Sequence, residues 1–155
     1  INESMKFTNL QKYLDEFAKD VEDDYIQYLS NQNYQIAKTI TTRVDLMGNS
    51  YTVYMNLAEY WKYIEYGRRP GKRPPINSIL KWVRNKGITP RGGIKMSQRS
   101  LAYVIAKKIG EFGIKPRPVL FEKIIKSKNF ETNVLNAFKK DIKEDLDSIK
   151  NWNNV

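Results

Sequence analysis

The spacing of apolar residues changes twice along this chain, and the change limits the folds that the chain can adopt. Apolar residues recur at steps of three or four from Leu10 to Tyr28, at alternate positions over residues 40–57, and again at helical spacing from Ile79 to Ile149. A period near 3.6 predicts a helix with one buried face, and a period of 2 predicts a strand with one buried face. A helix, two strands and then further helices are typical of an α+β domain.

The first helix is expected to run from a capping box at Thr8 and Gln11 to about Ser30. In such a box the Thr8 side chain accepts from the third helical amide, and the Gln11 side chain reaches back to the start. The expected inner face consists of Leu10, Leu14, Phe17, Val21, Tyr25 and Tyr28. The outer face carries Asp15, Glu16, Asp20, Glu22, Asp23 and Asp24. This acidic face is either a solvated surface or a docking surface for a basic partner, which includes another copy of the chain.

Residues 40–57 predict a β-hairpin with one buried face. The turn between its strands is Met47-Gly48-Asn49-Ser50, in which Gly48 and Asn49 are expected to supply positive φ angles. Two strands alone are marginally stable in water. We therefore expect the first helix to pack on the apolar face of the hairpin, and another strand or another chain to extend the sheet.

The second half of the chain predicts helices separated by short connectors. A short helix is expected within residues 58–66, another from Pro75 or Ile76 to Gly87, and a third from the N-cap Ser97 to Gly113. Residues 88–96 read as a flexible connector, residues 119–125 as an apolar helical turn, and residues 131–150 as a C-terminal amphipathic helix. The predicted fold is a single α+β domain over residues 1–155, in which a small antiparallel sheet packs against the long N-terminal helix and several later helices.

The net charge of +10 is unevenly distributed. Residues 1–35 hold three basic and seven acidic side chains, residues 36–130 hold twenty and five, and residues 131–155 hold four and five, giving −4, +15 and −1. A basic centre of this kind favours contact with acidic protein or with nucleic acid, although a soluble basic surface has the same composition.

Two missing residue types remove several catalytic mechanisms. The chain has no histidine and no cysteine, so it has no Ser-His or Cys-His pair and no thiolate metal site. Asp20, Asp23 and Asp24 share one helix, whereas a metal site for phosphoryl chemistry needs ligands from several elements. We expect no enzyme activity, no catalytic residue, no metal and no cofactor. Without a run of about 18 apolar residues, we also expect no membrane partner.

The stretch 65–75 is the strongest candidate interaction element. Three prolines restrict its φ angles, two glycines permit turns, and four cations stand within six positions: Arg68, Arg69, Lys72 and Arg73. Beside it stand Tyr60, Trp61, Tyr63 and Tyr66. The rings and cations suit a protein interface, and they also suit stacking of single-stranded bases. The alternative function is therefore that of a basic nucleic-acid-binding accessory protein that uses residues 68–75 and the adjacent aromatics.

Two short motifs, a proline-rich basic stretch and the order of all three resemble a known family. Glu65-Tyr66-Gly67-Arg68 follows the hairpin, an Arg-x-Pro-Gly-Lys-x-Pro-Pro stretch begins at Arg68 and leads to the helix of Trp82, and Arg117-Pro118-Val119-Leu120 opens a late helix. Over residues 7–125 this order resembles the neck and minor tail proteins of tailed bacteriophages, of the head–tail joining or tail-completion type. Arg68 stands where threonine is common in that family, and Val119 where an aromatic is common.

The resemblance implies a structural virion protein, assembled in the host cytoplasm, that acts as a connector at the neck or tail junction. Its partners would be other phage neck, connector or tail proteins and further copies of itself in an oligomeric ring, with non-specific contact to DNA in the channel. The expected interface residues are Tyr66, Gly67, Arg68, Arg69, Lys72, Arg73, Pro74, Pro75, Arg117 and Pro118. A closed ring needs two different surfaces on each copy, and the acidic first helix and the basic centre are such a pair.

Overall fold

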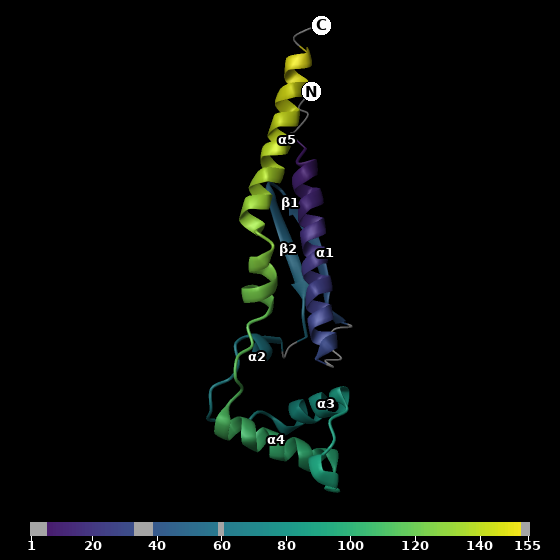
Figure 1. Cartoon of the computed structure of the whole chain (residues 1–155), viewed down its shortest axis with the longest axis vertical. Coiled ribbons are helices and arrows are strands. Elements are labelled where there is room, and N and C mark those ends of the chain that lie inside the picture. Colours follow the sequence, from purple (N-terminus) through teal and green to yellow (C-terminus); the bar gives the residue numbers. More distant parts are fainter. Residues whose placement is uncertain (1–5, 33–38, 59–60, 153–155) are drawn as a thin grey trace. The chain divides into compact units, whose positions relative to one another are not determined.

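The computed structural model describes residues 6–32, 39–58 and 61–152 and has the predicted α+β fold (Figure 1). The elements are α1 (Thr8–Asn31), β1 (Thr41–Met47), β2 (Ser50–Asn56), α2 (Trp61–Glu65), α3 (Ile76–Lys86), η2 (Arg91–Gly93), α4 (Gln98–Phe112), η3 (Leu120–Ile125) and α5 (Phe130–Trp152). The segment η3 is π-helical, and η2 is a single 3-10 turn within the predicted connector. Among the described helices, none combines the length and the apolar character that a bilayer crossing requires.

The chain divides into two compact units, each built from segments far apart in sequence. We call the unit of residues 1–25, 40–56 and 120–155 the terminal unit, and the unit of residues 26–39 and 57–119 the central unit. The helix α1 contributes to both units. The expectation of a single domain stays a prediction.

The N-terminus of α1 is capped by a carboxylate from α5 rather than by its own side chains. Asp141 accepts hydrogen bonds from the backbone amides of Asn9 and Leu10, each at 2.8 Å. The amide of Gln11 instead donates to the Phe7 carbonyl at 2.9 Å, and the Gln11 side chain bonds to Asp15. The predicted capping box is therefore wrong, because a partner distant in sequence satisfies the first amides of the helix.

Within the terminal unit, α1 and α5 pack antiparallel through aromatic rings. Phe7 stacks on Phe138 with ring centroids 5.4 Å apart, and Phe17 lies 4.5 Å from Phe130. The buried residues of α1 are Leu14, Ala18, Val21, Tyr25 and Leu29. Leu14, Val21 and Tyr25 belong to the predicted inner face, whereas the predicted Leu10, Phe17 and Tyr28 are only half-buried, and Ala18 and Leu29 were not predicted. The helical period therefore located the buried face of α1 to within one position.

The hairpin has the predicted register, with Thr41 opposite Asn56 and Met47 opposite Ser50. Gly48 has a φ of 62°, but Asn49 is not among the described residues with positive φ. Positive φ at the first turn position alone is the pattern of a type II′ turn, and it corrects the expectation for Asn49. Within the described part of the chain the sheet has these two strands only, so no further strand extends it there.

In the central unit, α3 and α4 form a helical pair (Figure 1). Leu80, Val83 and Ala102 are buried between them. The Ser97 hydroxyl accepts from the Ser100 amide at 3.1 Å, as predicted for an N-cap, and Gly87 ends α3 in the left-handed conformation with φ of 62°. The pattern of caps and glycines therefore located this pair correctly.

Candidate functional site

The structure brings together the two motifs that carry the family resemblance, although about fifty residues separate them in sequence. Residues 64–71 and 110–119 lie side by side in the central unit, and we call this pairing the clasp. Four backbone hydrogen bonds of 2.7–2.8 Å join the two segments: two between Arg68 and Ile114, one from Gly71 to Gly110 and one from Arg117 to Ile64. The basic loop of residues 65–75 is thereby held by backbone hydrogen bonds to residues 110–114. This agrees with the restricted conformation expected from its prolines.

Glycines permit the close approach of the two segments. Gly67 has a φ of 68°, and a Cβ atom there would come within 2.7 Å of the Pro116 nitrogen and closer still to the Ile114 carbonyl oxygen. Gly113 has a φ of 72°, and its Cβ atom would lie 2.9 Å from the Pro70 nitrogen. Both positions therefore require glycine for space as well as for conformation.

Glu65 is buried and links the two segments of the clasp through a hydrogen bond. Its side chain is 1% exposed, and Oε1 accepts from the backbone amide of Val119 at 3.3 Å. The first residue of the Glu65-Tyr66-Gly67-Arg68 motif thus contacts the third residue of the Arg117-Pro118-Val119-Leu120 motif. A buried carboxylate in this position joins the two motifs, which gives it a structural role.

The four cations of the loop have different environments. The Arg68 guanidinium donates to the Lys72 carbonyl at 2.8 Å and lies 5.9 Å from the centre of the Tyr63 ring. The Arg73 guanidinium lies 5.6 Å from the Tyr103 ring centre and donates to its hydroxyl at 3.2 Å. Arg69 and Lys72 are exposed side chains. Arg68 and Arg73 therefore stabilise the conformation of the loop, whereas Arg69 and Lys72 face solvent.

The other predicted interface residues divide in the same way. Tyr66 is 64% exposed, with its ring edge-on to Trp61, and Pro75, Arg117 and Pro118 are also exposed. Gly67 is half-buried within the clasp, and Pro74 is buried. Pro74 therefore contributes to packing inside the unit, and its surface is not open to a partner. Tyr60 of the aromatic cluster lies outside the described residues.

Sequence reasoning missed the part of this site that α4 contributes. Gly110 is buried in that helix, and a Cβ atom there would come within 2.8 Å of the Arg73 side chain and 3.2 Å of the Gly71 carbonyl oxygen. Tyr103 supplies the ring and hydroxyl for Arg73. A glycine inside a helical pattern is the one indication in the sequence that could have pointed to this contact.

The electrostatic character of the central unit is strongly basic. Its residues 26–39 and 57–119 hold sixteen Lys and Arg against three Asp and Glu, a net charge of +13. At the end of α3, burial and then the charge of Arg117 lower the pKa of Lys86. The positive charges of Lys86 and Arg117 therefore repel each other within the central unit.

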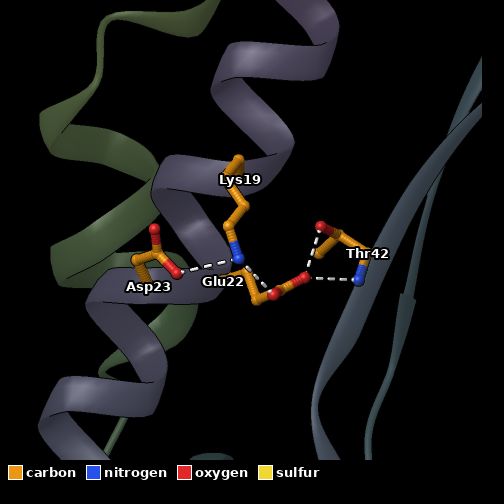
Figure 2. A network of polar contacts seen from close by, with 4 residues as sticks. All are labelled: Lys19, Glu22, Asp23 and Thr42. Atoms are coloured by element: carbon orange, nitrogen blue, oxygen red, sulfur yellow. Dashed lines mark hydrogen bonds and ion pairs between the residues drawn. The ribbon is translucent and has the colours of Figure 1, made fainter.

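A groove of about 340 Å³ in the terminal unit lies between α1 and β1, and two of its charged lining residues, Lys19 and Glu22, are paired with each other (Figure 2). Glu22 accepts from the Thr42 amide and hydroxyl, each at 2.7 Å, and Lys19 bridges Glu22 at 2.7 Å and Asp23 at 3.1 Å. The ion pair with Lys19 and the bonds from Thr42 lower the pKa of Glu22. No group of three or more carboxylates that could hold a metal ion occurs in the described ranges. Much of the acidic face of α1 thus serves the fold.

No family model, no curated protein and no solved structure matches this chain.

Proposed function

We propose that this protein is a structural component of a tailed-phage particle, acting as a head–tail joining or tail-completion adaptor through protein–protein contacts in a ring. The observation that carries the proposal is the clasp. The two motifs of the resemblance are separate in sequence, and their backbones pair through Arg68 and Ile114. Because the two motifs pair with each other, the structure offers a physical reason why both would occur in the same protein.

The mechanism is binding by a pre-ordered loop. The loop pays little entropy on contact because prolines, the backbone bonds of the clasp and the internal bonds of Arg68 and Arg73 already hold it. Tyr66, Arg69, Lys72, Arg117 and Pro118 are exposed and would meet the neighbouring protein. Tyrosine and arginine are enriched among the residues that dominate protein interfaces.

The acidic face of α1 is a weaker candidate for the second ring surface than the sequence indicates. Glu22 is engaged by Thr42, Asp23 by Lys19, and Asp24 by Lys128 at 2.7 Å. An incoming basic partner would have to replace these contacts. The proposal therefore rests on the exposed side chains of the loop, and Asp20 is an exposed acidic residue of α1 to which a basic partner could still bind.

The test replaces the two solvent-facing cations of the loop. In a phage that encodes this chain, the variant Arg69→Ser/Lys72→Ser should give filled heads and tails that stay separate, which electron microscopy of lysates counts directly. The variant Lys139→Ser/Lys143→Ser is the matched control, since it removes two exposed cations from α5. Normal joining in the loop variant would overturn the proposal, as would an equal defect in the control.

A further inference from the structure

The chain carries no acidic residue between Glu65 and Glu111. Residues 66–110 contain twelve Lys and Arg and no Asp or Glu. This run includes the loop, α3, the connector and α4, so the charge extends well beyond the loop that the sequence singles out.

Ten of the twelve cations are exposed. They are Arg69, Lys72, Arg73, Lys81, Arg84, Arg91, Lys95, Arg99, Lys107 and Lys108. None of these ten forms an ion pair with a carboxylate of the residues that the structure describes. Their charge is therefore available to a partner outside the chain.

Two of these cations, Arg99 and Lys107, lie on α4, and two others, Arg73 and Arg84, contact side chains of α4. We call these four residues the basic ridge. Arg99, Tyr103 and Lys107 stand four residues apart and share one face of the helix, over roughly 12 Å at the rise of an α-helix. Arg73 contacts Tyr103 in the middle of this face, and Arg84 of α3 donates a 3.4 Å hydrogen bond to Gln98, the residue before Arg99.

We infer that the basic ridge and the exposed cations around it bind the phosphate backbone of double-stranded DNA without reading its sequence. Duplex DNA presents one negative charge for every ~1.7 Å of its axis, and a ridge of this length faces several phosphates at once. Six of the twelve cations are lysines. Lysine is depleted in protein–protein interfaces, whereas it serves phosphate binding as a point charge.

The ridge favours duplex over single-stranded DNA. Proteins that hold single strands stack bases on open aromatic rings. The ring on the ridge is Tyr103, and the Arg73 guanidinium covers one of its faces and donates to its hydroxyl. The ridge thus offers charge in place of a stacking platform. This inference does not depend on the adaptor role, because the four ridge residues are not among the side chains assigned to the neighbouring protein, and because the test uses the isolated protein.

The experiment measures binding of the full chain to a 30-base-pair duplex of arbitrary sequence by fluorescence anisotropy, over a series of salt concentrations. The logarithm of the binding constant should fall linearly with the logarithm of salt concentration, by about 0.9 for each phosphate contacted. Arg99→Gln/Lys107→Gln should reduce this slope by about 1.8 and weaken binding at least tenfold at low salt. Lys139→Gln/Lys143→Gln carries the same charge change on α5 and should leave the slope within error.

Several outcomes would overturn the inference. One is absence of binding at 50 mM salt, and another is an equal loss of slope in both variants, which would indicate bulk charge. A duplex of a second sequence should bind within about threefold of the first, and a clear preference would contradict backbone contact. Tighter binding to a single strand of the same length would favour the base-stacking alternative. Circular dichroism of both variants establishes that each is folded.

Discussion

The two units of this protein use charge in opposite ways. The terminal unit holds eleven Lys and Arg against fourteen Asp and Glu, and several of its carboxylates bind groups of the same unit. Asp141 caps α1, Glu22 holds β1, and Asp24 pairs with Lys128. The central unit holds sixteen basic against three acidic side chains, and backbone amides, close glycines and the buried Glu65 join its segments.

The two units show two uses of charge. Carboxylates of the terminal unit stabilise its fold, whereas exposed cations of the central unit are available to bind a partner. Most exposed ion pairs contribute little, so the carboxylates that matter in the terminal unit are those with backbone amide partners. In the central unit, folding depends on sterics and backbone geometry. Its solvent-facing cations, such as Arg69 and Lys72, are therefore expected to change without loss of the fold, as residues of a binding surface can.

The largest effect is expected where the clasp depends on glycine. Gly67→Ala places a Cβ atom against Ile114 and Pro116 and should lower the free energy of unfolding by about 4 kcal/mol. Gly92→Ala is the matched control, since Gly92 also has a positive φ (72°) but nothing lies within 4 Å of its Cβ position. The control should lose only about 1 kcal/mol, the cost of the left-handed conformation. Urea unfolding measures both, and equal losses would mean that the clasp adds nothing beyond backbone strain.

A smaller loss is expected at the cap between α1 and α5. Asp141→Asn removes a charged acceptor of three hydrogen bonds, two from the amides of Asn9 and Leu10 and one from the Asn9 side chain. The expected loss is about 3 kcal/mol at pH 7. Glu144→Gln, which changes an exposed acceptor of the same Asn9 side chain, should cost less than about 0.5 kcal/mol. A loss at Asp141 no larger than that at Glu144 would contradict the capping role.

The same cap predicts a pH dependence. Burial alone would raise the pKa of Asp141, but hydrogen bonds from Asn9 and Leu10 outweigh it and hold the pKa below its usual value. Because the folded pKa lies below the unfolded value of about 3.9, the stabilisation is present above that pH and is lost as pH falls through the folded pKa. The difference in unfolding free energy between the parent protein and Asp141→Asn should therefore shrink below about pH 4. A difference that stays constant down to pH 2 would contradict this linkage.

A still smaller effect is expected where α1 meets the hairpin. Glu22→Gln keeps one acceptor for Thr42 but removes the charge, and should cost about 1 kcal/mol. Asp20→Asn, at an exposed position of the same helix, should change stability by less than about 0.3 kcal/mol. Thermal unfolding of both variants checks the contrast, and similar shifts would mean that the contact with Thr42 is not stabilising.

The smallest effect is expected in the central unit's exposed cations. Arg69→Ser/Lys72→Ser should change the free energy of unfolding by less than about 0.5 kcal/mol in either direction. Relief of repulsion between like charges opposes any small loss of packing. A destabilisation above 2 kcal/mol would show that these cations support the fold, and it would remove the contrast between the two units.

Local patterns predicted the elements well because the causes of those elements are local. The helical stripe of α1, the turn at Gly48 and the caps at Ser97 and Gly87 each depend on residues within one or two turns of chain. The same reasoning failed at Thr8, where a side chain from residue 141 replaced the expected capping box. A partner 132 positions away leaves no trace in the local pattern.

The candidate site was predictable in part. The composition of residues 65–75 indicated a rigid basic loop, and the structure places Arg69 and Lys72 in solvent as expected for an interaction element. The pairing of Arg68 with Ile114 and the burial of Glu65 and Pro74 were not predictable, because each depends on which distant segment lies alongside. Prolines and charged residues in a sequence predict that a loop is rigid and polar, but they do not predict which of its residues are exposed to a partner.

The clasp also has a consequence for the order of folding. Its backbone pair closes a loop between positions 68 and 114, and each doubling of loop length adds only about 0.6 kcal/mol to the entropy of closure. The helices α3 and α4 lie inside that loop and pack on each other through residues closer in sequence, so we expect their contact to form first. Interactions that form after the rate-limiting step slow unfolding without speeding folding. The clasp would then determine the unfolding rate of the central unit, and the contact between α3 and α4 would determine its folding rate.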